Sequence, residues 1–393
     1  MKGWRKFRLG IACITNANSY TPKEKWKFVN YLDTGNITDN KINAIQYIDI
    51  ENEKLPSRAR RKVQENSIIY STVRPKQRHF GIIRNQPDNF LVSTGFVVID
   101  VNESIFDADF LYYLLTQNIV VEKLHTIAEQ SVSTYPSIKP SDIENLEISI
   151  PDIVVQKRIA SILGCLDKKI EQNNMINKNL LKQAQSIFTQ EFLMLNRIPD
   201  GWKESSLLGI ADYLNGLAMQ KYRPKDNEQG LPVLKIKELR QGYCDFSSEL
   251  CSPSIKPEYI IHDGDVIFSW SGSLLVDLWC GGTCGLNQHL FKVTSSTYDK
   301  WFYYAWTKYH LQKFAAIAAD MATTMGHIKR EELSKAEVLI PSQSDYNRIG
   351  SLLAPLYELV ISNRIENRKL ASLRDELLPQ LMSGQLDVSE VPL

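Results

Sequence analysis

Basic side chains cluster at two comparable places in this 393-residue chain, next to predicted β-strands. Guanidinium and ammonium groups neutralise phosphates, so such clusters are typical of contact with a polyanion. A single run of charge is more often a solvated face, but recurrence at two matching places favours a function. The cations that we select as candidate phosphate contacts are Arg74, Lys76, Arg78, Lys221, Arg223, Lys235 and Lys237.

Hydroxyl side chains stand at the ends of the same predicted strands. Ser71 and Thr72 lie at the end of the first strand, and Ser269 and Ser271 lie at the end of its counterpart. Short polar side chains at such places can reach base edges in the major groove of DNA, so these four residues are weaker candidates for base contact.

One group of cysteines and histidines has residue types that suit zinc. Cys280 and Cys284 form a Cys-x3-Cys pair, with His262 and His289 not far away in sequence. Zinc sites built on cysteine usually show Cys-x2-Cys spacing, and the first half of the chain has no counterpart. Reduced thiols are therefore the better explanation, and we predict no metal.

Motifs that bring catalytic chemistry are absent from the sequence. There is no phosphate-binding Gly-x4-Gly-Lys-Ser/Thr loop, no Asn-Pro-Pro-aromatic or Asp-Pro-Pro-aromatic motif, no His-Glu-x-x-His and no Gly-x-Ser-x-Gly. The acidic pair Asp263 and Asp265 precedes a strand, where a polar turn explains it as well as a metal would. We expect a non-catalytic chain with no cofactor of its own.

Composition describes an ordinary globular chain. There are 46 basic and 45 acidic residues, a net charge of +1, and 43% of the residues are hydrophobic. Near-neutral charge argues against a sequence-blind polyelectrolyte but allows local basic patches. No run of about 18 apolar residues occurs, so we expect no membrane span and a cytoplasmic location.

The chain contains an internal repeat. Residues 151–159 align with 341–349, since Arg158 matches Arg348, an offset of 190 residues. The same offset aligns five further residues of the first copy with identical residue types in the second. They are Leu163, Leu166, Asn173, Asn177 and Leu180, which align with Leu353, Leu356, Asn363, Asn367 and Leu370. The repeat predicts a mixed domain followed by a helix, used twice. Duplex DNA is the commonest molecule with matching pseudo-two-fold symmetry.

Residue patterns predict the elements of each repeat. β-branched and aromatic runs predict strands at 67–73, 90–99, 146–150, 265–270, 289–293 and 336–340. Three-and-four spacing predicts helices at 108–129 and 300–319 that pack on the sheets. Ser/Thr-rich loops with a strand are expected at 131–138 and 322–328. Pro151 and Pro341 should end a strand and start a helix.

Two long apolar stripes predict helices from Gln156 to about Leu193 and from Asn347 to about Met382. Each would be about 55 Å long, and neither can bury its stripe alone. We predict an α+β fold in which an antiparallel coiled coil of these two helices separates two mixed α/β domains, with a pseudo-two-fold internal repeat. The expected boundaries are 1–150 and 197–340 for the mixed domains, and 151–196 and 341–393 for the helical regions.

Two details of the helices stay open to the structure. Gly164-Cys165 and Ala354-Pro355 occupy matching positions, where we expect a kink or a short break. The four matched asparagines are either polar residues that set the register of the coil or solvated flank positions, and the sequence favours neither.

Local phrases, taken in order, resemble one family, the specificity subunit of type I restriction-modification systems. They are Ser67 to Pro75, Leu91 to Phe96, Gly264 to Ser273, Leu286 to Leu290 and the strand-Pro-helix junctions at Ile150-Pro151 and Ile340-Pro341. The resemblance covers essentially the whole chain, because the order, duplication and spacing of the phrases match.

The resemblance implies a non-catalytic subunit that recognises DNA. In that family two target-recognition domains each read one half of a bipartite site in double-stranded DNA, and the coiled coil fixes the gap. Implied partners are methyltransferase subunits, two by the symmetry of the repeat, which bring S-adenosylmethionine, and restriction subunits, which bring ATP-driven cleavage.

Two other functions remain as alternatives. A coiled-coil scaffold whose two lobes bind protein or carbohydrate ligands would also suit the near-neutral charge. A self-sufficient nuclease or methylase is disfavoured by the absent motifs. The target bases do not follow from the sequence, because readout depends on loop geometry and on DNA shape.

Overall fold

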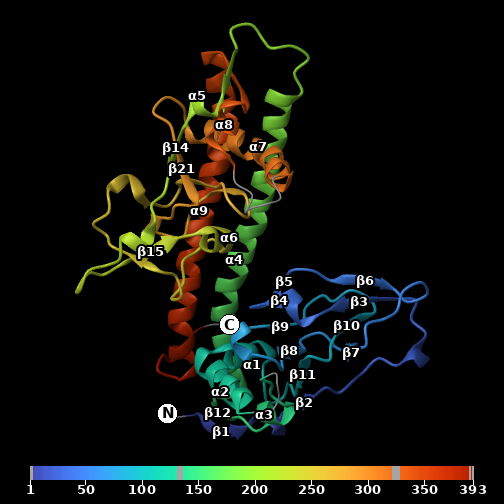
Figure 1. Cartoon of the computed structure of the whole chain (residues 1–393). Coiled ribbons are helices and arrows are strands. Elements are labelled where there is room, and N and C mark those ends of the chain that lie inside the picture. Colours follow the sequence, from blue (N-terminus) through green and yellow to red (C-terminus); the bar gives the residue numbers. More distant parts are fainter. Residues whose placement is uncertain (1–2, 131–135, 321–327, 389–390, 392–393) are drawn as a thin grey trace. The chain divides into compact units, whose positions relative to one another are not determined.

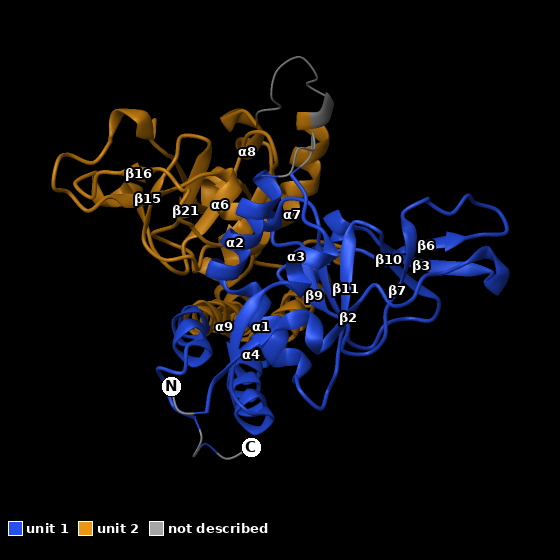
Figure 2. Cartoon of the chain, turned by 90° about the horizontal axis from the view of Figure 1, so that it is seen from below, with its two compact units in different colours: residues 1–168, 372–393 blue, residues 169–371 orange. Residues whose placement is uncertain are grey.

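The structure is a computed structural model that describes residues 3–130, 136–320, 328–388 and 391. The expected Ser/Thr-rich loops fall mainly on 131–135 and 321–327, outside the described residues. The chain divides into two compact units, residues 1–168 with 372–393 and residues 169–371 (Figure 2). Among the described residues no helix is long and apolar enough to traverse a lipid bilayer.

Unit 1 contains two four-stranded sheets. The first sheet has the order β2-β11-β8-β9, namely β2 (Cys13–Thr15), β11 (Phe96–Val101), β8 (Ile68–Ser71) and β9 (Phe80–Ile82). The second has the order β6-β3-β10-β7, namely β6 (Gln46–Asp49), β3 (Phe28–Leu32), β10 (Phe90–Ser93) and β7 (Ala59–Lys62). Two short pairs complete the unit, β1 (Arg5–Arg8) with β12 (Glu147–Ile150) and β4 (Ile37–Thr38) with β5 (Lys41–Ile42) (Figure 1).

Unit 2 repeats this arrangement. One sheet has the order β14-β21-β18-β19, namely β14 (Asp212–Asn215), β21 (Leu290–Thr294), β18 (Val266–Ser269) and β19 (Leu275–Leu278). The other has the order β16-β15-β20-β17, namely β16 (Leu250–Cys251), β15 (Leu231–Leu234), β20 (Cys284–Leu286) and β17 (Ile260–Ile261). β13 (Lys203–Ser206) pairs with β22 (Glu337–Ile340) as β1 does with β12.

The two units share strand order and strand direction. In each, one sheet has a parallel pair at its centre, β3 with β10 and β15 with β20, while the other pairs of the four-stranded sheets are antiparallel. A parallel pair needs a long connection, so its recurrence at one place in both sheets is specific to the topology. The internal repeat predicted from the sequence is therefore present as a repeated fold.

Helices cover the sheets as the apolar spacing predicted. Unit 1 has α1 (Ala108–Thr116), α2 (Asn118–Glu129) and α3 (Pro140–Glu144), and unit 2 has α5 (Leu207–Ile210), α6 (Ile236–Gln241), α7 (Lys300–Asp320) and α8 (Arg330–Ser334). Aromatic contacts join helix to sheet: the Phe80 and Tyr112 ring centroids lie 6.5 Å apart, and those of Phe268 and Phe314 lie 6.0 Å apart. Such edge and stacked contacts add to the burial of these large side chains.

The long helices begin where the prolines predicted. α4 (Ile153–Phe188) follows Pro151, and Asp152 caps it by accepting hydrogen bonds from two backbone amides of the first turn. α9 (Gln343–Met382) follows Pro341, with Ser342 Oγ accepting from the amide of Asp345 at 3.3 Å. A π-helical turn at Thr189–Leu193 ends the first helix.

Both helices pass without interruption through the positions where we expected a kink or a break. α4 is continuous across Gly164, and α9 is continuous across Pro355, which is exposed. A proline inside a helix removes one backbone hydrogen bond, and here the neighbouring turns keep the helix intact. Neither helix is broken at these positions, so of the two expected features only a kink stays a prediction.

Within unit 2, α4 and α9 run antiparallel and bury the matched asparagines between them. Asn363 donates to Asn177 Oδ1 at 2.9 Å, and Asn173 donates to Asn367 Oδ1 at 2.8 Å. Asn173, Asn177 and Asn363 are at most 9% exposed. The repeat offset of 190 residues converts one pair into the other, so the pairs are related by the pseudo-two-fold. Three of the four asparagines are therefore buried and Asn367 is half-buried, and all four are partners across the helices and not solvated flank positions.

Charged contacts attach the β-rich part of unit 2 to α9. Arg368 forms two hydrogen bonds of 2.7 Å to the Asp263 carboxylate, and Arg364 donates to Asp277 at 2.9 Å. Within unit 1, Asp167 of α4 accepts from Tyr113 of α1 at 2.7 Å and from Arg374 of α9 at 2.8 Å. The two-pronged contact between Arg368 and Asp263 is directional, so it orients the β-rich part of unit 2 on α9.

We predict that replacing Asn177 alone by Leu destabilises the chain. Asn363 would keep a buried amide with no partner, which costs about 1–3 kcal/mol. The double variant with Asn177→Leu and Asn363→Leu should recover most of this loss, because neither amide is then buried. Thermal unfolding followed by helical circular dichroism measures both, and a single variant that melts like the wild type would contradict the predicted role of the pair.

Candidate nucleic-acid interface

The three predicted cations of unit 1 lie on the connection from β8 to β9. Arg74 precedes the short turn at Pro75–Gln77; it is exposed and forms no ion pair within the described part of the chain. Lys76 pairs with Glu122 of α2 at 2.9 Å. Arg78 donates to Asp39 at 2.6 Å and to Asn118 at 3.1 Å, and it stacks over Phe80. Arg74 is thus the cation best placed to contact a phosphate. Arg78 instead holds the β8–β9 connection in place through its hydrogen bonds.

The four predicted hydroxyl residues build turns at the ends of β8 and β18. Ser71 Oγ donates to the carbonyl of Val73 at 3.1 Å, and Thr72 Oγ1 donates to that of Gly95 at 3.0 Å. Ser269 Oγ donates to the carbonyl of Ser273 at 3.0 Å, and Ser271 Oγ lies 3.2 Å from a ring nitrogen of His289. Ser71, Ser269 and Ser271 are at most 3% exposed. Their hydroxyls are engaged in shaping the turns, and only Thr72 is half-exposed.

The predicted cations of unit 2 surround the entry to and exit from β15. Lys221 is exposed, in a short turn at Met219–Lys221, and forms no ion pair with any described residue. Arg223 and Lys235 both pair with Glu249. The Lys235 ammonium is the main cause of a lowered pKa for the Glu249 carboxyl, which keeps this carboxylate ionised. Because the shared Glu249 is exposed to solvent, a phosphate can compete for the two cations.

Lys237 forms an ion pair in unit 2 that is separate from the pairs at Glu249. Its ammonium lies 3.3 Å from the Asp245 carboxylate and 2.9 Å from Ser247 Oγ, and its side chain is 57% exposed. The contact therefore fixes the direction of the ammonium group while leaving much of it open to solvent.

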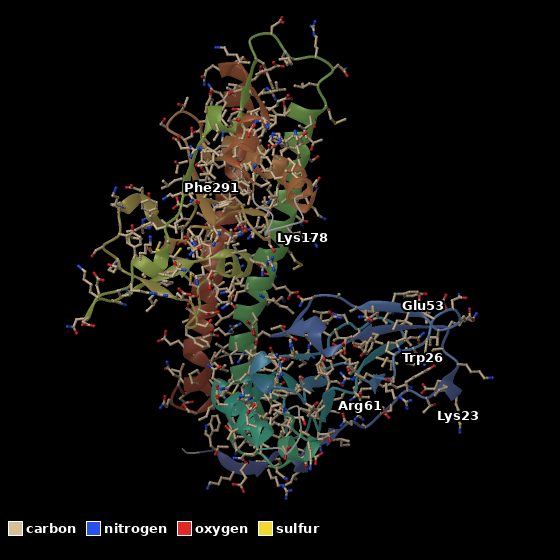
Figure 3. The ribbon with its side chains drawn as sticks, viewed as in Figure 1. Lys23, Trp26, Glu53, Arg61, Lys178 and Phe291 are labelled. Atoms are coloured by element: carbon tan, nitrogen blue, oxygen red, sulfur yellow. The ribbon has the colours of Figure 1, made fainter. Side chains whose placement is uncertain are left out.

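Further exposed cations of unit 1 were not selected from the sequence. They lie beside β3 and on β7, and none forms an ion pair within the described residues: Lys23, Lys25, Lys27, Arg58 and Arg60. Figure 3 shows Lys23, Trp26 and Arg61 in the part of unit 1 built from β3, β6, β7 and β10. For Arg58 and Arg60 the signal in the sequence was the alternation of basic residues at 58, 60 and 62, because a period of two places side chains on one face of a strand. Lys23, Lys25 and Lys27 lie in and after a short 3-10 turn, where no such period applies.

An aromatic residue joins this group of cations. Lys62 lies over the Trp26 ring, 5.1 Å from its centroid, and also pairs with Glu24. Trp26 in turn packs on Tyr20 with a centroid distance of 4.7 Å. These contacts hold the segment around Trp26 against β7. The backbone that carries the exposed lysines Lys23, Lys25 and Lys27 is therefore fixed in position.

The side chains considered for metal binding have other partners. Cys280 Sγ lies 3.7 Å from the carbonyl of Leu278, and burial raises the pKa of its thiol to about 11. Asp265 pairs with Lys292 at 2.9 Å, and Asp263 is held by Arg368. Among the described residues no group of three or more His, Cys, Asp or Glu is arranged to hold a metal ion.

A groove of about 510 Å³ lies in unit 2, between the start of α7 and α9. Aromatic and small residues line it, including Trp301, Tyr346, Gly350, Ala354 and Tyr357. Tyr346 Oη accepts a hydrogen bond from the amide of Asp299 at 2.8 Å, which joins α9 to the residue before α7. No predicted DNA-binding residue lines this groove.

Known proteins resemble this chain over its full length. It is 22% identical to the "Type I restriction enzyme HindI specificity subunit" of Haemophilus influenzae, covering 98% of this chain and 100% of that protein. It is 25% identical to the "Type I restriction enzyme MjaIX specificity subunit" of Methanocaldococcus jannaschii, covering 95% and 92%.

A solved structure has a similar fold. The crystal structure of the type I restriction-modification system S subunit from M. genitalium matches with a TM-score of 0.57 at 15% identity, over 96% of each chain. The family model of the type I restriction modification DNA specificity domain matches residues 1–182 and again residues 199–373. Two copies of this domain account for most of the sequence, and the chain belongs to the type I restriction-modification DNA specificity family.

Proposed function

We propose that the chain is the non-catalytic DNA-recognition subunit of a type I restriction-modification complex, and that the β-rich part of each unit reads one half of a bipartite target. The observation that carries the proposal is a repeated topology with divergent surfaces. Strand order is the same in both units, and both have cations beside the equivalent strands β3 and β15, yet further cations lie on β7 in unit 1 and on α6 in unit 2. Equal scaffolds with different surfaces are what two different half-sites require.

Four regions divide the work in this proposal. Residues 1–150 and 197–340 are target-recognition domains, and residues 151–196 and 341–393 are helical spacer regions. The spacer helices set the gap between the half-sites through their register, which the asparagine pairs define. Contacts to phosphate position each domain on the duplex, and contacts to base edges supply its specificity.

The proposed partners supply the chemistry. Two methyltransferase subunits, which bring S-adenosylmethionine, dock on the coiled coil, and restriction subunits join the complex to cleave DNA. Exposed leucines on α9 support the docking step: Leu352 and Leu359, seven residues apart, are each 45% exposed. Residues seven apart lie on one face of a helix, so the pair offers an apolar stripe to a partner helix.

The proposal is tested by selection from randomised duplex DNA with the chain assembled with its methyltransferase subunits. We expect enrichment of two short specified segments separated by a gap of constant length. One short contiguous site, or no enriched sequence, would contradict the proposal. Methyl transfer by the purified chain alone would contradict the assignment as non-catalytic.

We predict that Lys221→Ala together with Arg223→Ala weakens DNA binding at low salt by about tenfold or more. Each lost phosphate contact should also lower the slope of log affinity against log salt by about 1. Lys335→Ala is the matched control, since Lys335 is exposed in the same unit but is paired with Glu331 on α8. Unchanged affinity at low salt would show that Lys221 and Arg223 do not face DNA.

Salt dependence also separates the proposal from the alternative of a coiled-coil scaffold with two ligand-binding lobes. Counterion release makes DNA affinity fall steeply with added salt, whereas a lobe that binds a neutral ligand shows little change. Binding that is insensitive to salt from 50 to 200 mM would favour the scaffold.

We predict that Leu352→Lys together with Leu359→Lys weakens association with the methyltransferase subunit. Two buried ammonium groups at an apolar contact are strongly unfavourable, so co-purification should fall at least tenfold. The thermal midpoint of the isolated chain should change little, because both leucines are exposed in it. Full retention of the methyltransferase subunit would place docking elsewhere on the chain.

A further inference from the structure

Phe246 is the most exposed of the large apolar residues that the structure describes. It lies on the connection from α6 to β16, and its exposure of 105% means that it has no cover from the rest of the chain. Tyr243, three residues earlier, is 52% exposed. Single apolar residues on a surface are common, so exposure alone carries no functional meaning. The hydrogen bonds that hold the connection are the evidence that the exposure of Phe246 is functional.

Hydrogen bonds fix the backbone on both sides of Phe246. The Asp245 carboxylate accepts from the amide of Ser247 at 2.8 Å and from its hydroxyl at 2.5 Å, while the Asp245 amide donates to Ser248 Oγ at 3.0 Å. The hydrogen bonds from Ser247 lead the contacts that lower the pKa of Asp245 to about 2, so the carboxylate is ionised at neutral pH. Phe246 is therefore held out in solvent by its neighbours, because the turn leaves its backbone little freedom to fold back.

A buried carboxylate anchors this turn to α6. Glu238 is 3% exposed; its two oxygens accept from Ser248 Oγ at 3.1 Å and from the backbone amide of Lys235 at 3.2 Å. A buried charge is costly unless it is hydrogen-bonded, so these contacts constrain helix and turn together. We call residues 242–249 the Phe246 turn; it begins at Gly242, whose φ of +85° ends α6.

Four cations flank the Phe246 turn, and three of them pair with its carboxylates at Asp245 and Glu249. Lys237 reaches into it through Ser247 Oγ, and Arg240, exposed on the same helix, forms no ion pair with any described residue. Arg223 and Lys235 lie at its far end on Glu249. Lysine is depleted at the centres of protein interfaces, whereas cations next to an apolar residue suit a duplex, whose phosphates flank its bases. The surroundings of Phe246 therefore favour DNA over a protein partner.

Unit 1 has exposed apolar residues on the equivalent connection. There the chain passes from β3 to the edge strand β6 as it passes in unit 2 from β15 to β16. Ile42 and Ile45 on this connection are 44% and 39% exposed. The same topological position thus presents apolar side chains in both copies, with different residues in each.

We infer that Phe246 is a specificity-determining residue that enters a groove of the DNA and makes an apolar contact with the bases of one half-site. The contact is either with a thymine methyl group in the major groove or with a base step that the ring partly unstacks. The inference rests on the proposed function and deepens it. The cations around the Phe246 turn hold the adjoining phosphates.

The test uses the full chain assembled with its methyltransferase subunits, selected against the same randomised duplexes. With Phe246→Ala, we expect the gap and one half-site to be unchanged, while at least one base position of the other half-site loses about tenfold or more of its preference. Phe246→Leu should retain much of the preference. Ile119→Ala is the control, since Ile119 is apolar and 75% exposed in unit 1 but lies on α2.

Two modified forms of the duplex selected by the wild type distinguish the contacts. Deoxyuridine in place of thymine removes the methyl group, and 2-aminopurine fluorescence rises when a base step is unstacked. An effect of either kind that Phe246→Ala abolishes supports the inference; the absence of both effects overturns it.

Other outcomes also decide the matter. If the Phe246→Ala complex selects the wild-type motif with unaltered preferences, the inference is overturned although the bipartite motif still supports the proposed function. If the variant loses methyltransferase subunits and keeps the motif, Phe246 contacts protein and the inference is wrong. If the wild type selects no bipartite motif, the proposed function fails and the inference fails with it.

Discussion

Two pairs of asparagine amides between α4 and α9 impose the register on which the rest of the chain depends. An unpaired amide buried between helices costs about 1–3 kcal/mol, so the helices favour the alignment that pairs them all. A slip of seven residues in either direction would place Asn177 opposite Leu356 or Leu370 in place of Asn363, with the same apolar pattern around it. Leucines alone would tolerate such a slip, and the asparagines do not. The helix pair is thereby less stable than one with leucines at these positions, but it has a single alignment.

The register matters because the arginines that orient the sheets of unit 2 stand on the same helix. Arg364 and Arg368 are four residues apart, on one face of α9, and each reaches a carboxylate on the β-rich part. Burial of these guanidinium groups is offset by the carboxylates and by backbone carbonyls, with Arg368 also donating to Cys280 at 2.6 Å. One helix therefore carries both the asparagines that define its alignment and the arginines that aim the sheets. A change of register would move both together.

The sequence predicted the elements whose pattern is local and missed what depends on distant partners. Strands β8, β18 and β21 and the two strand-Pro-helix junctions were predicted because alternation and proline act within a few residues. Residues 90–99, however, were predicted as one strand and form β10 and β11 in different sheets, since apolar residues continue on both sides of Gly95, the one local mark of the turn. The helix predicted at 108–129 is broken at Gln117, whose ψ of 139° is extended.

For the candidate site the same distinction holds. Arg74, Lys76 and Arg78 were selected for their place beside a strand, yet Glu122 and Asp39 occupy two of them from far away in the sequence. A charge pattern shows where cations occur, but it cannot show which of them have partners after folding. Only the folded chain shows that Lys23, Lys25 and Lys27 form no ion pair with a described residue.

The two copies of the repeat agree in their long helices and differ on the surface of their β-rich parts, and this difference follows from what each part must do. Helices that align through buried amides tolerate few substitutions, because a change on one helix needs its match on the other. Connections such as the one from β15 to β16 begin and end on the same sheet, so their surface residues can change without moving the strands. Yet a reading residue on a loose loop would lose binding free energy when it becomes ordered. The hydrogen bonds around Asp245 and Glu238 remove that loss while leaving the identity of residue 246 independent of the fold. The same chain can therefore keep one scaffold while the exposed surfaces of its two units differ.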